Sequence, residues 1–175
     1  MVAFGRKLPI GIQTFSDIRT QGYLYVDKTA LVWQVANGGK PFFLSRPRRF
    51  GKSLLLSTFE AYFEGRKELF EGLAIEKLED KWEKHPVFHM DLNARKYERA
   101  EDLIAMLNQF LEKWEAIYGT EKQDRAPEER FAYVIQKAYE RTGKGVVVLI
   151  DEYDKPLLQA LHNNDLLEAY RIILK

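Results

Sequence analysis

The sequence contains no cysteine, which excludes a disulfide framework and a thiolate metal site. It also lacks a long apolar run, because the longest purely aliphatic stretch, residues 146–150, is far shorter than the roughly 20 residues that a helix needs to cross a bilayer. The first ten residues have no long apolar core of the kind found in a signal peptide. We therefore expect a cytoplasmic protein that is not integral to a membrane.

Neither sign of charge is in excess. The 27 lysines and arginines are matched by 26 aspartates and glutamates, so no global basic field drives sequence-independent binding to nucleic acid. Any basic function must therefore be local. At 175 residues and 46% hydrophobic content, the chain is large enough to bury one sizeable core, and we expect one globular domain.

Histidine patterns typical of metal sites are missing as well. His85, His89 and His162 do not share a metal-ligand spacing, and no H-E-x-x-H motif occurs. We interpret these three histidines as structural. Base-stacking aromatic residues are not indicated either, because the candidates fall on the core faces of predicted helices: Trp114, Tyr118, Phe131 and Tyr139.

The apolar pattern predicts buried strands that alternate with amphipathic helices. The predicted strands cover residues 42–44, 86–91 and 146–150. The predicted helices cover residues 28–35 (with Asp27 as cap), 52–64, 103–118, 127–142 and 155–175. Trp82, in the connector before the second strand, is predicted to be a local packing anchor. This alternation predicts an α/β fold, a three-layer domain with a mainly parallel sheet and with ligands at the carboxyl ends of its strands.

Residues 45–53 read Ser-Arg-Pro-Arg-Arg-Phe-Gly-Lys-Ser and follow the first predicted strand. The final Gly51-Lys52-Ser53 is typical of a phosphate-binding loop, in which backbone N–H groups hold phosphates, the lysine neutralises them and the hydroxyl binds Mg²⁺. The predicted helix that follows adds an N-terminal dipole that favours an anion. We therefore predict a phosphate site at this loop.

The loop departs from the common pattern at its start. The position five residues before Gly51 is usually glycine and is Arg46 here, while Pro47 removes one N–H donor. Arg46, Arg48 and Arg49 can replace the lost backbone contacts with charge-assisted bonds to phosphate. The alternative, that some of these arginines point outward as solvated charges, stays open.

Asp151 and Glu152 follow the last predicted strand, and we expect each of them to have a different role. Asp151 would bind Mg²⁺, directly or through water, while Glu152 would orient and deprotonate the attacking water. The structural alternative is a capping pair, which we favour for Asp154, with Pro156 in the first turn of the next helix. Asp91 ends the second strand and either reaches the same crevice or caps a turn.

Four ordered motifs resemble the AAA-ATPase-like domain family of P-loop ATPases. They are Leu8-Pro9-Ile10-Gly11-Ile12-Gln13, Tyr25-Val26-Asp27-Lys28-Thr29, the segment 43–54 and the segment 149–157. The resemblance spans nearly the whole chain and includes an arginine-bearing phosphate loop. It implies ATP and Mg²⁺ as cofactors and Lys52 and Glu152 as catalytic residues. The implied metal ligands are Ser53 and Asp151, and the implied nucleotide-binding residues are Arg46, Arg48, Arg49, Phe50, Gly51, Lys52, Ser53 and Leu54.

The resemblance also sets an expected domain organisation. Residues 1–39 would form an N-terminal helical segment, and residues 40–175 would form part of the ATPase core. Family members typically continue into further core strands and often into a restriction-endonuclease-like nuclease domain. We therefore expect the sheet of this chain to be incomplete at its C-terminus, without the strand that carries a polar sensor residue.

Three functions are compatible with these motifs. The leading hypothesis is an ATP-binding, Mg²⁺-dependent ATPase module that acts as a nucleotide-driven switch for associated domains. The second is a nucleotide-dependent scaffold that does not hydrolyse. The third is a basic loop that binds the backbone of a nucleic acid, which the near-neutral net charge disfavours. A small-molecule kinase is a further alternative, but the adjacent acidic pair favours water as the acceptor of the phosphoryl group. The preference for ATP over GTP follows from the family resemblance.

Overall fold

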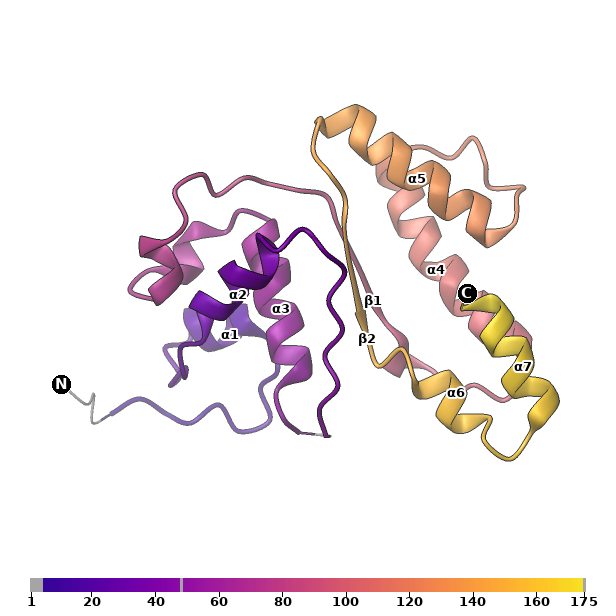
Figure 1. The fold of residues 1–175 in the computed structure, drawn as a ribbon, viewed down its shortest axis with the longest axis horizontal. Helices are drawn as coiled ribbons and strands as arrows, with labels where there is room; N and C mark the ends of the chain where they lie inside the picture. Colours follow the sequence, from indigo (N-terminus) through magenta and orange to yellow (C-terminus); the bar gives the residue numbers. More distant parts are fainter. Residues whose placement is uncertain (1–4, 48, 175) are drawn as a thin grey trace. The chain divides into compact units, whose positions relative to one another are not determined.

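The computed structural model describes residues 5–47 and 49–174 (Figure 1). The chain forms two compact units, one that ends at His85 and one that begins at Pro86. Within the described residues, no helix combines the length and the apolar character that a membrane span requires.

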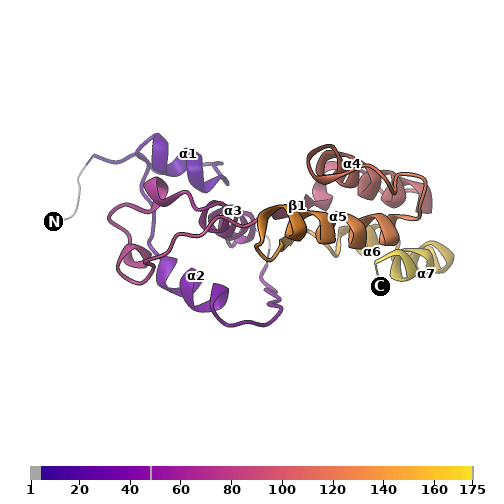
Figure 2. The same ribbon diagram turned by 90° about the horizontal axis from the view of Figure 1, so that it is seen from above.

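The first unit is helical. It contains α1 (Phe15–Thr20), α2 (Thr29–Ala36) and α3 (Lys52–Phe63), followed by the short 3₁₀ helices η1 (Lys67–Phe70) and η2 (Ala74–Lys77). Helix α3 contacts both α1 and α2 and lies between them (Figure 2). It ends as its sequence predicts: Gly65 adopts a φ of 70°, and the N–H of Arg66 returns to the carbonyl of Ala61.

Aromatic rings fill the core of this unit. The rings of Phe15 and Phe70 lie 4.8 Å apart, and both side chains are fully buried. Trp82 packs against Phe70 and Tyr62, with ring centroids 5.1 and 5.9 Å away. Trp82 is therefore the local packing anchor that its position in the charged connector predicts.

The second unit contains the sheet. Strand β1 (Val87–Asp91) runs parallel to β2 (Val147–Asp151), with Phe88 beside Val148 and Asp91 beside Asp151. Between the strands the chain forms η3 (Leu92–Ala94), α4 (Ala100–Tyr118) and α5 (Pro127–Thr142); after β2 it forms α6 (Lys155–Gln159) and α7 (Asn164–Ile173). A helical crossover is what a parallel pair of strands requires.

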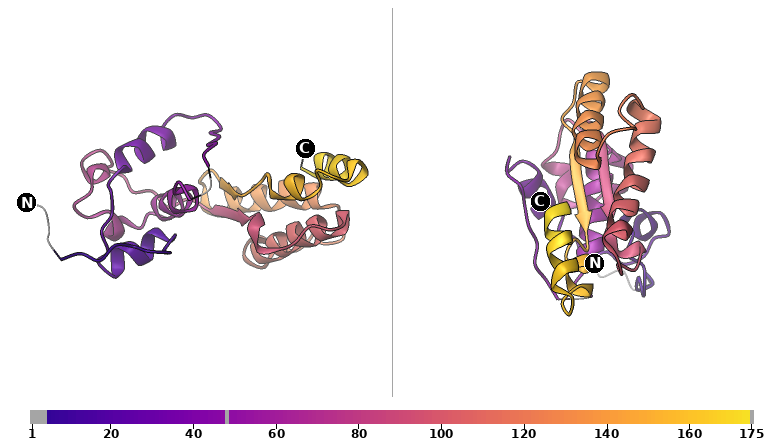
Figure 3. Two further views of the ribbon diagram at one scale, coloured as in Figure 1. Left: turned by 90° about the horizontal axis from the view of Figure 1, so that it is seen from below. Right: turned by 90° about the vertical axis from the view of Figure 1, so that its right-hand side faces the viewer.

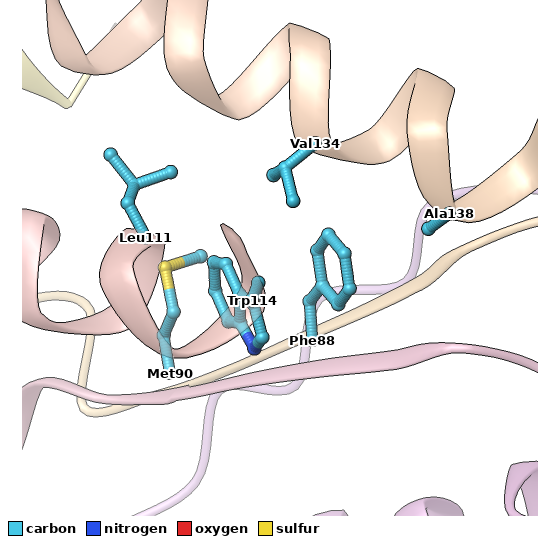
Figure 4. Close-up of a cluster of buried hydrophobic side chains, with 6 residues drawn as sticks. All are labelled: Phe88, Met90, Leu111, Trp114, Val134 and Ala138. Carbon is cyan, nitrogen blue, oxygen red and sulfur yellow. The ribbon is translucent and has the colours of Figure 1, made fainter. Parts of the chain in front are cut away.

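Helices α4 and α5 pack on β1 (Figure 3). The Phe88 and Trp114 rings are stacked 4.4 Å apart, and α5 contributes small side chains opposite them. Figure 4 shows this cluster, which consists of Phe88, Met90, Leu111, Trp114, Val134 and Ala138. The cluster confirms the period-3.6 pattern that predicts both helices, since their apolar stripes face β1.

The predicted strand at residues 42–44 is wrong. These residues have no regular secondary structure, and Phe42 and Phe43 are 62% and 65% exposed. A strand exists only where its backbone is paired with a neighbour, which a short apolar run does not specify by itself. The described sheet has two strands, so the chain is a mixed α/β structure and the expected three-layer P-loop fold is not complete in it.

Three smaller predictions also need correction. The expected single helix over residues 155–175 is two helices, because Asn163 caps α7 by accepting a hydrogen bond from the N–H of Leu166. Asp154 precedes α6, but its side chain makes no capping hydrogen bond. Tyr139 is 58% exposed, since its position on α5 lies at the edge of the stripe that packs on β1.

Candidate functional site: a basic loop and an acidic pair

The phosphate-loop candidate leads into the N-terminus of α3. Residues 41–47 are irregular, Gly51 is the N-cap residue, and Lys52, Ser53 and Leu54 form the first turn of the helix. The twelve-residue helix therefore presents its unpaired N–H groups and the positive end of its dipole at Lys52 and Ser53. Ser53 lies in this first turn and is half-buried.

The backbone of the loop alternates in handedness. Arg49 has a φ of 68°, Phe50 has a negative φ, Gly51 has a φ of 75°, and Lys52 begins the right-handed helix. Alternation of this kind turns successive N–H groups towards a common point and forms an anion-binding concavity. A non-glycine residue with positive φ is uncommon, so the conformation of Arg49 marks this segment as a constrained one.

Lys52 folds back over the loop. Its Nζ donates a hydrogen bond to the carbonyl oxygen of Arg46, 3.1 Å away. This contact closes a ring of seven residues and places an ammonium group at the loop that the alternating backbone forms. The contact joins two of the predicted phosphate-binding residues, Lys52 and Arg46, whose role stays a prediction.

Two arginines of the loop, Arg46 and Arg49, lie at the surface of the described chain. Arg46 and Arg49 are exposed, and neither guanidinium forms an ion pair with a carboxylate of the described chain. Phe50, between them and the helix, is 62% exposed. Arg48, the remaining predicted phosphate ligand, lies outside the described residues. The loop thus carries positive charge at its surface.

The acidic pair lies at the carboxyl end of β2 in the second unit. Asp151 is 7% exposed, and its Oδ1 accepts a hydrogen bond from the N–H of Glu152, 3.0 Å away. Glu152 has a φ of 52°, and its carbonyl accepts the N–H of Lys155 as the chain turns into α6. Glu152 is held in a backbone conformation that glutamate rarely adopts, so the turn fixes the direction in which its side chain leaves the strand.

Asp91 is a turn residue. It lies beside Asp151 in the register of the sheet, and its Oδ1 accepts a hydrogen bond from the N–H of Asn93, 2.8 Å away, at the start of η3. The structure confirms the capping interpretation of Asp91.

Neither predicted metal ligand, Ser53 or Asp151, belongs to a self-sufficient metal site among the described residues. Within the described ranges, no three histidine, aspartate or glutamate side chains are grouped as a self-sufficient metal site. Mg²⁺ characteristically takes one or two protein ligands and completes its shell with phosphate oxygens and water. The hydroxyl of Ser53, in the first unit, is a ligand of that kind, and so is the carboxylate of Asp151, in the second unit.

Asp27 also makes a long-range contact that the sequence does not predict. Its carboxylate accepts hydrogen bonds from the N–H and hydroxyl of Thr29 at the start of α2, as a helix cap does, and also from the N–H of Ala74, 2.7 Å away. The Thr29 hydroxyl in turn accepts the N–H of Ile75. In the sequence, the only signal for these contacts is the presence of the two polar residues Asp27 and Thr29. We assign these two residues to the packing of η2 against α2.

The charge state of Asp27 follows from these contacts. Burial alone would raise its pKa, but the hydrogen bonds from Thr29 and Ala74 outweigh burial, and the pKa of Asp27 lies below its ordinary value. The carboxylate is therefore ionised wherever the unit is folded at neutral pH.

Comparison with known proteins places these motifs in a family. Residues 9–175 match the AAA-ATPase-like family, described as predicted AAA-ATPase. The chain belongs to this family. It is also 41% identical over 173 residues to an uncharacterised protein encoded in the vnfD 5′ region of Azotobacter chroococcum mcd 1. The match covers 95% of this chain and 32% of that relative, so the chain spans about a third of the relative's length. No solved structure matches the chain.

Membership of the family confirms the resemblance carried by the four sequence motifs. It implies nucleotide binding in general. The identity of the nucleotide, the metal and the individual site residues remain predictions.

Proposed function

We propose that the chain is an ATP-binding, Mg²⁺-dependent P-loop ATPase module whose nucleotide state acts as a switch for associated domains. The observation that carries the proposal is the alternating backbone of Arg49 to Lys52 at the N-terminus of α3. It combines an anion-binding concavity, a helix dipole and the Lys52 ammonium group in one short segment of a protein from a predicted ATPase family.

In this proposal the loop holds the phosphates of the nucleotide. The N–H groups at residues 49–53 bind phosphate oxygens, and Lys52 exchanges its bond to the Arg46 carbonyl for one to phosphate. Arg46, Arg48 and Arg49 add guanidinium contacts. Ser53 and Asp151 would hold Mg²⁺, which when bound neutralises charge on the β- and γ-phosphates.

Hydrolysis as proposed depends on Glu152. Its carboxylate accepts a proton from a water molecule as the water oxygen bonds to the γ-phosphorus. The bond between that phosphorus and the β–γ bridging oxygen breaks, and ADP and inorganic phosphate leave. The positive φ of Glu152 favours this role over a capping role, because a cap does not require a strained backbone.

The target of the switch belongs to the proposal as well. The sequence resemblance indicates a restriction-endonuclease-like nuclease as one associated domain. The 32% coverage of the Azotobacter relative is compatible with a module that works beside further domains.

The test is binding of a fluorescent ATP analogue, with and without Mg²⁺, to the wild-type chain and to Lys52→Ala, with phosphate release followed in the same samples. We expect the variant to bind about 10- to 100-fold more weakly, since it loses a charged hydrogen bond worth about 1.5–3 kcal/mol. Lys67→Ala, an exposed lysine in the same unit, is the control and should bind as wild type does. Equal binding by wild type and Lys52→Ala would exclude the loop as the phosphate site.

A further inference from the structure

We propose that Lys155 is a positioning residue for Glu152, and that it acts by tying the turn after β2 to the turn after β1. This inference rests on the proposed function, because it concerns the residue to which activation of water is assigned. It goes beyond that function by naming a residue, outside the predicted site residues, on which hydrolysis depends.

The turn that carries Glu152 has two hydrogen bonds of its own. The N–H of Glu152 donates to Oδ1 of Asp151, and the carbonyl of Glu152 accepts the N–H of Lys155, both at 3.0 Å. These bonds lie between residues 151 and 155, so they shape the turn without joining it to another part of the unit. Glu152 has a φ of 52°, and such a conformation persists only where the surrounding structure fixes it. The turn therefore needs an anchor elsewhere in the unit.

The side chain of Lys155 supplies this anchor. Its Nζ donates a hydrogen bond to the carbonyl oxygen of Asn93 in η3, 2.5 Å away and 62 residues earlier in the chain. A charged donor forms a stronger hydrogen bond than a neutral one. Asn93 is itself fixed, since its N–H donates to Oδ1 of Asp91, 2.8 Å away. Asp91 lies beside Asp151 in the register of the sheet, so the bond from Lys155 joins the turns that follow the two strands.

Helix α6 keeps a second contact with the same segment. It has only five residues, and isolated helices shorter than about 12 residues are marginal in water, so it depends on contacts with its surroundings. Oε1 of Gln159 accepts the N–H of Tyr97, 2.8 Å away. Lys155 and Gln159 are one turn apart on α6 and lie on the same side of it. Loss of the Lys155 side chain should therefore loosen the turn at Glu152 while Gln159 keeps α6 attached.

The first test separates turnover from nucleotide affinity. Lys155→Met keeps the aliphatic stem and removes the donor, so single-turnover phosphate release should fall about 10- to 100-fold, as expected when a catalytic group is displaced. Binding of a fluorescent ATP analogue should stay within about twofold of wild type. Lys155→Arg keeps a cationic donor and should restore release to within about fivefold of wild type. Lys122→Met, at an exposed lysine between α4 and α5, is the control and should change neither quantity.

Two results of this test would overturn the inference. An ATP affinity that falls as much as turnover does would show that Lys155 contacts the nucleotide. Unchanged phosphate release in Lys155→Met, beside a loss in Glu152→Gln, would show that Glu152 works without this anchor, and the proposed function would stand.

A double-mutant cycle tests whether Lys155 acts through Glu152. When Lys155→Met is added to Glu152→Gln, phosphate release should slow by less than about twofold, because the base that Lys155 positions is already absent. A purely structural contribution would lower the rate by the same factor in both backgrounds. Equal factors would therefore overturn the inference.

Amide hydrogen exchange gives a readout that does not depend on activity. Lys155→Met should speed exchange of the amide at position 155 by about tenfold and leave the amides of β1 and β2 protected, since only the turn is released. If the wild type releases no phosphate, the proposed function fails, and the exchange rate still decides whether the side chain of Lys155 holds the turn. Unchanged exchange at position 155 overturns the inference whatever the activity.

Discussion

Glu152 occupies a backbone conformation that its residue type disfavours, at the end of the strand that carries Asp151. Such strain persists only where the surrounding structure fixes it, and here the Asp151 carboxylate and the Lys155 N–H hold both sides of the residue. A general base must lie within hydrogen-bond reach of the water that it deprotonates, and we propose Glu152 for this role.

Replacement of Glu152 with glutamine tests this role at the residue scale. Glu152→Gln keeps the size of the side chain and removes the base, so phosphate release should fall about 10²- to 10⁴-fold while ATP binding is retained. The measurement is single-turnover phosphate release beside equilibrium binding. Glu168→Gln, an exposed glutamate of α7, is the control. Unchanged turnover in Glu152→Gln would favour the non-hydrolysing scaffold.

Asp27 offers a second residue-scale prediction, one of stability. Asp27→Ala removes the acceptor for Thr29 and Ala74 and should lower the free energy of unfolding by about 1–2 kcal/mol, as the loss of a helix cap does. Asp80→Ala, an exposed aspartate in the same unit, should leave the free energy of unfolding nearly unchanged. Urea denaturation of the three proteins measures the difference.

The pH dependence of that difference has a definite sign. Because the folded-state pKa of Asp27 lies below its unfolded value, its contribution is complete above the unfolded pKa, about 4, and is lost as the pH falls through the folded pKa. The gap in stability between wild type and Asp27→Ala should therefore be constant near neutrality and shrink in acid. A gap that grows in acid would contradict the hydrogen-bonded carboxylate.

At the scale of elements, a buried ion pair joins α4 to α5. The guanidinium of Arg130 donates to both carboxylate oxygens of Glu115, at 2.8 and 2.7 Å, and to Asn108, and the two charged residues are 6% and 1% exposed. The hydrogen bonds from Arg130 outweigh burial and lower the pKa of Glu115. The pair thus fixes the register of two helices whose apolar stripes pack on β1.

Breaking this pair should be costly. Glu115→Ala leaves Arg130 buried without a counter-charge, and we expect a loss of about 3–5 kcal/mol in the free energy of unfolding. The double variant Glu115→Met with Arg130→Met should recover much of that loss, since no charge remains buried. Denaturant titration measures both. A single variant as stable as wild type would show that the pair does not link the helices.

The predictability of each element reflects where its stabilising contacts come from. Helices α4 and α5 follow from the spacing of their own apolar residues, and Gly119 and Gly143 mark their ends. Helix α1 has only six residues and depends on tertiary contacts, such as the Ser57 hydroxyl that accepts the N–H of Phe15, which no local pattern reveals. The strand expected at residues 42–44 was wrong for the converse reason, because apolar character does not supply a backbone partner.

The candidate site, too, is only partly predictable from the sequence. Gly51, Lys52 and Ser53 are readable from sequence, since a helix start follows them. The positive φ of Arg49 and Glu152 and the bond from Lys52 to the Arg46 carbonyl are not readable, because they depend on the path of the backbone. The sequence does not predict that Arg130 pairs with Glu115, because the helical periodicity is read from apolar residues only.

At the scale of the whole molecule, the phosphate loop belongs to one unit and the acidic pair to the other. The proposal assigns ATP binding to the loop of the first unit and assigns activation of water to Glu152 of the second unit. ATP binding and ATP hydrolysis should therefore respond differently to substitution. Variants of the loop should reduce both, whereas variants of Asp151 or Glu152 should reduce turnover more than nucleotide affinity.

The most direct test of the central claim is a ¹⁵N-resolved NMR titration of the chain with a non-hydrolysable ATP analogue, first without and then with Mg²⁺. The account predicts that the nucleotide shifts the amide signals of Arg49 to Ser53, and that Mg²⁺ adds shifts at Asp151 and Glu152. Shifts that leave residues 49–53 unchanged while other parts of the chain respond would contradict a phosphate site at this loop.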